Sequence, residues 1–267
     1  MPRYEFRSPR LFVEAPLAPG VRVPLDAAPL HYLRDVLRLK PGDPVLVFNG
    51  RDGEWRAELA EAGRRSMALA VVAATRPQTP PGDLHYLFAP LKRARLDYLV
   101  QKAVEMGASR LAPVVTRHTQ AERVNSERMR ANVIEAAEQC GVLALPAVAE
   151  PVAFDKALAA LSPDRTLIFC DEDAPVADPV AALAAARRPA PGESAPAETA
   201  GPRPLAVLIG PEGGFSEEER AVLLDRPGVV RIALGPRILR ADTAAVAALA
   251  LVQAVLGDWG VAPGSTG

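Results

Sequence analysis

The chain has few of the residues that mark a disulfide framework or a metal site. Its 267 residues include two cysteines and three histidines. Cys140 and Cys170 form no CxxC pair and are too few for a disulfide framework, which fits a reducing compartment. His31, His85 and His118 are widely separated in sequence. We therefore expect no bound metal.

Several common motifs are also missing. The sequence contains no GxGxxG and no GxxxxGK[ST] segment, which disfavours nicotinamide enzymes and nucleotide hydrolases. No apolar signal stretch follows Met1, and the longest uncharged run, residues 243–257, is too short to span a bilayer. The formal net charge of −1 gives no strong polyanion-binding signature. We expect a cytoplasmic protein without a membrane role.

The first 75 residues have the pattern of a small β-barrel domain. Short strand-like runs alternate with turns that contain Gly, Asn and Asp, and the runs cover residues 45–48, 54–59 and 67–72. The Pro-rich segment 75–83 is the expected boundary to the rest of the chain. The expected domains are therefore residues 1–75 and 76–267.

A helix is expected before those strands, over residues 30–40. Leu30, Leu33 and Leu37 form an apolar stripe at helical spacing. The polar face carries His31, Arg34, Asp35 and Arg38, and Pro41-Gly42 ends the pattern. Cations on such a face are usually solvated surface residues, so the pattern alone does not identify a partner.

The second part of the chain alternates between strand and helix patterns. Strands are expected at residues 84–90, 110–115, 167–170, 205–209 and 229–234. Two helices between them have apolar stripes, formed by Leu96, Leu99, Val100 and Ala103 and by Met129, Val133, Ala136 and Cys140. This alternation predicts a parallel sheet with helices on its faces. Residues 186–204 are expected to form an irregular inserted loop.

Two strand-to-helix loops near the C-terminus carry the strongest functional signal. Their sequences are Leu208-Ile-Gly-Pro-Glu-Gly-Gly-Phe-Ser216 and Leu234-Gly-Pro-Arg-Ile-Leu-Arg-Ala-Asp-Thr243. Glycine lets a ligand approach main-chain groups, and α/β proteins place small-molecule sites in such loops. Ser216 and Glu219 form a capping box, whose neighbouring glutamates disfavour a bound anion. We predict a ligand held mainly by backbone.

Together these loops resemble the paired motifs of the SPOUT class of S-adenosylmethionine-dependent RNA methyltransferases, and in particular the RsmE family. Support extends to residues 6–11, 31–43, 49–59, 92–107 and 135–141. Val142 stands where the family usually has arginine, and the 186–204 loop is longer than usual. The resemblance implies a PUA-like β-barrel for RNA, a C-terminal α/β domain with a parallel sheet and a trefoil knot, and a homodimer.

The resemblance also implies the activity and the site. The expected reaction is methylation of N(3) of a uridine in 16S ribosomal RNA of the small ribosomal subunit, with S-adenosyl-L-methionine as cofactor. Cofactor-binding candidates are Leu208, Ile209, Gly210, Pro211, Gly213, Leu234, Gly235, Ile238, Leu239 and Thr243. Arg240 is the candidate for stabilising a uracil anion or holding a phosphate, with Glu212 for polar contact or proton transfer. Candidate RNA contacts are Arg3, Arg7, Arg10, Arg34, Arg38 and Lys40.

Three alternatives remain open at this point. A SPOUT methyltransferase acting on a ribose 2′-hydroxyl or on transfer RNA would share the cofactor loops but not the match over residues 1–75. A non-catalytic RNA-binding protein of ribosome assembly would keep the fold without the reaction. For Arg240, a surface salt bridge is the competing structural role.

Overall fold

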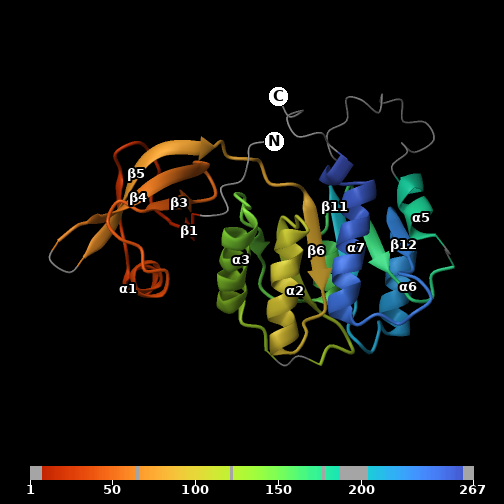
Figure 1. The fold of residues 1–267 in the computed structure, drawn as a ribbon. Coiled ribbons are helices and arrows are strands. Elements are labelled where there is room, and N and C mark those ends of the chain that lie inside the picture. Colours follow the sequence, from red (N-terminus) through yellow and green to blue (C-terminus); the bar gives the residue numbers. More distant parts are fainter. Residues whose placement is uncertain (1–7, 64–65, 121–122, 176–177, 187–203, 261–267) are drawn as a thin grey trace. The chain divides into compact units, whose positions relative to one another are not determined.

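The computed structural model describes residues 8–63, 66–120, 123–175, 178–186 and 204–260. The chain forms two compact units, Met1–Pro81 with Ile134–Leu145, and Gly82–Val133 with Pro146–Gly267. Figure 1 shows a mainly β first unit and an α/β second unit. The predicted domains, residues 1–75 and 76–267, differ from these units, because residues 134–145 belong to the first unit. The division into two domains at residue 75 stays a prediction. Within the described segments, every helix is too short or too polar to cross a membrane.

The first unit is built on a five-stranded sheet in the order β1-β3-β4-β5-β2. β1 and β3 are parallel and the other pairs are antiparallel. The three predicted strands are present, and each extends further than expected, β3 by a single residue. The bounds are β1 Arg10–Phe12, β2 Arg22–Pro24, β3 Pro44–Phe48, β4 Glu54–Glu61 and β5 Met67–Arg76.

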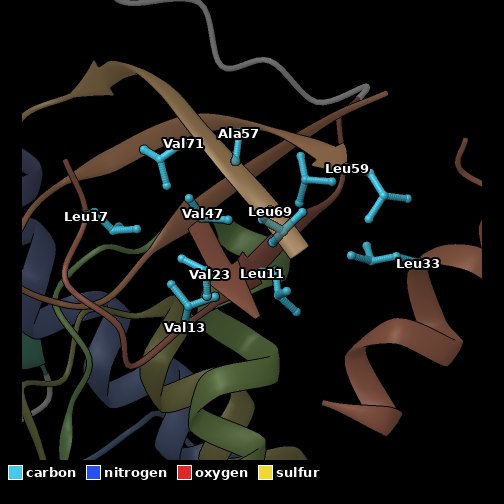
Figure 2. Close-up of a cluster of buried hydrophobic side chains, with 11 residues drawn as sticks. Leu11, Val13, Leu17, Val23, Leu33, Val47, Ala57, Leu59, Leu69 and Val71 are labelled. Atoms are coloured by element: carbon cyan, nitrogen blue, oxygen red, sulfur yellow. The ribbon is translucent and has the colours of Figure 1, made fainter. Parts of the chain in front are cut away.

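Alternating side chains of this sheet form the core of the first unit (Figure 2). On β4, Ala57 and Leu59 point inward and are at most 1% exposed, while Glu58 between them is partly exposed. The remaining members of the cluster are Leu11, Val13, Leu17, Val23, Leu33, Val45, Val47, Leu69 and Val71. Burying each large aliphatic side chain contributes about 1.5–3 kcal/mol.

The helix predicted over residues 30–40 differs from the expectation. It consists of α1, Ala27–His31, followed by a π-helical turn η1, Tyr32–Val36, in which the amide of Leu37 donates to Tyr32 at 2.9 Å. Leu33 is fully buried, but Leu37 is 37% exposed. Arg38 follows the helix with φ +58°, so it does not share the helix face of Arg34. The prediction of one regular apolar and polar stripe is wrong, because the wider π-turn changes the angular spacing of side chains.

A buried ion-pair network joins β1, β4 and β5. The Glu54 carboxylate accepts from Arg10 Nε at 2.8 Å and from Arg76 at 2.7–2.9 Å, and Thr75 donates at 2.9 Å. The Arg10 guanidinium also donates to the carbonyls of Ala137 and Glu138. Burial raises the pKa of Glu54, but Arg76, Arg10 and Thr75 outweigh it and leave the pKa below its usual value. Arg10, a predicted RNA contact, is therefore an interior residue.

We expect Glu54→Gln to lower the free energy of unfolding by about 3 kcal/mol, because it leaves two buried guanidinium groups without their carboxylate. The pKa of Glu54 is lower in the folded than in the unfolded state. Glu54 therefore stabilises the fold at pH values above its unfolded-state pKa, and this stabilisation is lost as the pH falls through its folded-state pKa. The variant should show a shallower loss of stability in acid. Urea unfolding across a pH series measures both effects.

Glu58→Gln is the matched control, since Glu58 lies on the same strand and its carboxylate is 42% exposed, 3.7 Å from Arg56. Its effect should stay within about 0.5 kcal/mol. If Glu54→Gln unfolded at the same urea concentration as wild type, the ion-pair network would have no stabilising role.

The second unit contains the predicted parallel sheet, in the order β12-β10-β11-β6-β7-β8, with β9 pairing to β7. All of its strand pairs are parallel. The strands are β6 Leu84–Phe88, β7 Arg110–Val115, β8 Ala147–Val148, β9 Val152–Ala153, β10 Thr166–Cys170, β11 Leu205–Ile209 and β12 Val229–Ile232. The helices are α2 Arg93–Glu105, α3 Ser126–Cys140, α4 Phe154–Ala159, α5 Pro179–Ala186, α6 Glu217–Asp225, α7 Ala241–Val255 and the short η2 Asp258–Gly260.

Helices cover both faces of this sheet. Side chains of α4 and α6 pack with Leu87, Phe169 and Leu208 on one face. α7 contacts β11, α2 and α5 on the other. The predicted inward positions of α2 are all buried, and so are Met129, Val133 and Ala136 on α3. Cys140 is exposed instead, because it is the last residue of α3 before the left-handed Gly141. Residues 187–203, most of the predicted inserted loop, lie outside the described residues.

Candidate active site

A cavity of about 380 Å³ lies at the carboxyl ends of β10, β11 and β12. β10 lies between β11 and β12 in the sheet although it precedes both in sequence, so the loops after these three strands meet at one edge. The walls are residues 169–173, residues 209–215 with Arg220, and residues 232–241 with Ala244, apart from Ala233 and Pro236. The two loops singled out in the sequence thus enclose a common space.

Most of the predicted cofactor residues line this cavity. They are Ile209, Gly210, Pro211, Gly213, Leu234, Gly235, Ile238 and Leu239. Leu208 does not, because its side chain is fully buried in the core cluster with Leu87 and Phe169. Thr243 is also absent from the lining, since it is an exposed residue in the first turn of α7. Whether the lining residues hold a cofactor stays a prediction.

Two glycines of the lining differ in what they permit. Gly235 has φ +93°, a left-handed backbone that branched residues rarely adopt, and no atom lies within 4 Å of the position of a Cβ there. At Gly210 a Cβ would lie 2.7 Å from the Phe215 ring. That ring packs on Phe154 and Phe169, with centroids 5.9 and 5.3 Å away. A valine at Gly210 would therefore disturb the core as well as the cavity, which the sequence did not reveal.

The loop after β10 contributes residues that sequence reasoning missed. Asp171 is 6% exposed and accepts from Arg220 at 2.9 Å and from Arg231 at 2.7 and 3.0 Å. Burial raises the pKa of Asp171, but the bonds from Arg220 and Arg231 outweigh it and lower the pKa overall. Burial, aided by Asp171, raises the pKa of the Cys170 thiol to about 12, so it stays protonated. The available signal was the acidic segment directly after the strand predicted at residues 167–170.

The two catalytic candidates have different surroundings. Arg240 is the N-cap residue of α7: its carbonyl accepts from the amide of Ala244 at 2.8 Å, and its exposed side chain belongs to the cavity lining. No ion pair of Arg240 occurs among the described residues. Glu212 lines the cavity but pairs with Arg95 of α2, at 3.3 Å between Oε1 and the guanidinium. The salt-bridge role weighed for Arg240 therefore applies to Glu212.

Comparison with known proteins shows the family. A model of the RNA methyltransferase domain matches residues 78–253, and a model of the RNA methyltransferase PUA domain matches residues 25–72. A ribosomal RNA small subunit methyltransferase E from Synechocystis is 31% identical over 237 residues, which cover 88% of this chain and 73% of the relative. The chain belongs to the ribosomal RNA small subunit methyltransferase E family. A member from Rickettsia conorii is 26% identical over 91% of this chain and 94% of its own.

Solved structures share the fold of this methyltransferase E family member. One is a ribosomal RNA small subunit methyltransferase E from Neisseria gonorrhoeae bound to S-adenosyl methionine, with a TM-score of 0.77, 23% identity, and coverage of 95% of this chain and 100% of that one. Another is a putative methyltransferase from Legionella pneumophila in complex with the same cofactor, with a TM-score of 0.72, 26% identity, and coverage of 93% and 98%. The fold is accordingly an α/β methyltransferase domain preceded by a PUA-like domain.

The candidate RNA contacts of this family member lie in the first unit. Arg3 and Arg7 fall outside the described residues, and Arg10 is buried on Glu54. Arg34, Arg38 and Lys40 are exposed and lie inside the PUA match. Arg34 pairs with Asp35 at 2.8 Å, and its hydrogen bonds, followed by the bond from His31, lower the pKa of Asp35 to about 2. The RNA contact of Arg34 stays a prediction, and such a contact would replace this exposed pair at little cost in water.

Proposed function

We propose that this protein methylates N(3) of a uridine in 16S ribosomal RNA of the small ribosomal subunit, with S-adenosyl-L-methionine as methyl donor. Membership of the ribosomal RNA small subunit methyltransferase E family carries the proposal. The cavity formed by the two family motifs supports it. The substrate name belongs to the relatives, and the N(3) position comes from the resemblance to RsmE.

The residues of the cavity fit the cofactor. Its volume of about 380 Å³ falls within the ordinary range of small-molecule sites, and its walls combine apolar side chains with glycine-containing backbone. Glu172 and Asp173 add carboxylates at the edge, which suit a ligand with cationic groups. Ile209, Leu234 and Leu239 would pack on the nucleoside, while the backbone around Gly210 and Gly235 would hold its polar groups. When bound, the cofactor supplies an electrophilic methyl group.

The protein's own residues have two tasks in the reaction. The transition state of methyl transfer from a sulfonium loses charge, so the largest contribution comes from positioning the acceptor nitrogen in line with the methyl group. The uridine nitrogen must also lose its proton, and Arg240 at the cavity is placed to stabilise the resulting uracil anion. Glu212 is less suited as a base, because its pair with Arg95 occupies one carboxylate oxygen.

The proposal includes a homodimer, a trefoil knot and a cytoplasmic location, as the resemblance implies. The knot is supported by the position of β10 between β11 and β12, which brings the two cavity loops together. Ala245 and Leu249 of α7 are already buried within one chain. A dimer would therefore use the other face of this helix. Sedimentation equilibrium measures the oligomeric state.

Two measurements test the function. Nucleoside analysis of small-subunit RNA from cells with and without the protein should show 3-methyluridine only when it is present. A methylated ribose, or a methylated transfer RNA, would assign a different substrate. Calorimetry with S-adenosylmethionine separates the enzyme from a non-catalytic assembly protein, which should give no heat of binding.

Arg34→Ala combined with Arg38→Ala should weaken RNA binding and flatten its dependence on salt. The reason is that a protein with fewer phosphate contacts releases fewer counterions when it binds. If both arginines contact phosphates, the slope of log affinity against log salt should fall by about 1–2. Cofactor affinity should not change, since neither residue lines the cavity. Filter binding at a series of salt concentrations measures the slope. An unaltered slope would leave these arginines as solvated surface residues.

A further inference from the structure

A short turn between β7 and α3 lies against the glycine-containing loop of the cavity. This β7 turn, residues 116–119, is fixed by its own hydrogen bonds. The amide of Thr119 donates to the Thr116 carbonyl at 3.2 Å, the amide of Thr116 donates to Thr119 Oγ1 at 2.9 Å, and the two hydroxyls are 2.9 Å apart. A turn closed in this way presents its central residues, Arg117 and His118, in a defined direction.

His118 contacts the backbone of the cavity loop. Its Nδ1 lies 3.2 Å from the carbonyl oxygens of both Gly213 and Gly214. Carbonyl oxygens only accept hydrogen bonds, so Nδ1 must carry the hydrogen and donate to the pair. The packing is close as well, because a Cβ at Gly213 would lie 3.3 Å from the Cβ of His118. Gly213 thus allows the approach that the shared hydrogen bond requires.

A second contact joins the same two segments. The amide of Arg117 donates to Glu219 Oε1 at 2.8 Å. The other oxygen of Glu219 accepts from the amide of Ser216 at 3.0 Å, as part of the capping box that begins α6. One carboxylate therefore ties the β7 turn to the start of α6, directly after Gly213 and Gly214. The glycine segment is therefore contacted directly by His118, and the helix start that follows it is bonded to Arg117.

We propose that His118 is a positioning residue, which holds the Gly213–Gly214 backbone in the shape that binds the cofactor. Gly213 and Gly214 line the cavity and His118 does not, so its effect must pass through them. Gly214 has φ +69° and its amide donates to the Pro211 carbonyl at 2.9 Å, so the loop closes one turn of its own, to which His118 adds the contact that holds the Gly213 and Gly214 carbonyls. The inference rests on the proposed function only in naming S-adenosylmethionine as the ligand.

Three variants of His118 test the role. Asparagine carries its amide nitrogen on Cγ, where histidine carries Nδ1, so His118→Asn retains the donor. His118→Ala and His118→Phe remove it, and Phe keeps the bulk. In calorimetry with S-adenosylmethionine, Ala and Phe should raise the Kd about tenfold, the effect of one hydrogen bond, while Asn stays within about threefold of wild type. In the cofactor-free protein, hydrogen exchange of residues 210–216 should accelerate in Ala and Phe but not in Asn.

Arg117→Ala is the matched control, because it removes an exposed side chain of the same turn and keeps the backbone amide that bonds Glu219. Its affinity for the cofactor and the hydrogen exchange of residues 210–216 should match those of wild type. Unchanged exchange and affinity in Ala and Phe would overturn the inference, and so would an Asn variant as impaired as Ala. A wild-type protein that binds no S-adenosylmethionine would refute the proposed function, and the exchange comparison would still decide the role of His118.

Discussion

Gly235→Val is expected to weaken S-adenosylmethionine binding by about 10- to 100-fold while the protein remains folded. Gly235 has φ +93°, and a β-branched residue there is strained by about 1–3 kcal/mol, so the loop should move to another conformation. Nothing lies within 4 Å of the added Cβ, so neighbouring side chains need not shift. Calorimetry gives the affinity, and circular dichroism with thermal melting reports the fold.

Gly228→Val is a control of the same kind. Gly228 has φ +75°, also has no atom within 4 Å of a Cβ, and lies between α6 and β12 away from the cavity lining. It should lose similar stability without loss of cofactor affinity. If Gly235→Val bound the cofactor like wild type, the cavity would not be the cofactor site. Gly210→Val is a poorer probe, since it also displaces the buried Phe215 ring.

Arg240→Ala should lower the single-turnover methylation rate by about 10²–10³ while the Kd for S-adenosylmethionine changes less than about threefold. The reason is that a contact with the uracil anion strengthens only as negative charge develops in the transition state. Lysine should restore little of the rate, because its compact charge on a flexible stem does not reproduce the planar fork of donors. Rates are measured at saturating RNA and cofactor, over a pH series.

Arg110→Ala provides the control for loss of a positive charge. Arg110 is an exposed arginine at the amino end of β7, whereas the cavity lies at the carboxyl ends of β10, β11 and β12. Its rate should match wild type. If Arg240→Ala kept the wild-type single-turnover rate and lost only RNA affinity, Arg240 would be a phosphate anchor and the catalytic assignment would be wrong.

The elements that the sequence predicted well are those governed by local periodicity. The α2 stripe and strands β6, β7, β10, β11 and β12 follow from apolar spacing within one segment and are present, whereas the two-residue strands β8 and β9 were not predicted. The two cavity loops were predictable for a similar reason, since glycine and proline mark special backbone wherever they occur. Ser216 and Glu219 form the capping box that their spacing indicated.

The features that sequence reasoning missed depend on pairs far apart in the chain. Nothing near Arg10 shows that its guanidinium meets Glu54, 44 residues later. The same holds for His118, which is 95 residues from Gly213. Asp171 joined the cavity only because the sheet order places β10 between β11 and β12. Partner choice among many arginines and carboxylates is decided by the assembled sheet, and no local pattern encodes it.

The discontinuous first unit has a consequence for synthesis of the chain. Its strands end at Arg76, yet Arg10 and Arg76 donate to carbonyls of Ala137, Glu138 and Gly141, which belong to the end of α3 and the residue after it. A ribosome must therefore add about sixty further residues before all segments of this unit exist. At ordinary elongation rates this takes several seconds. Until then the carbonyls of Ala137, Glu138 and Gly141 are not available to accept from the two arginines. The N-terminal domain should thus mature only after about a third of the methyltransferase domain, residues 78–253, has been made.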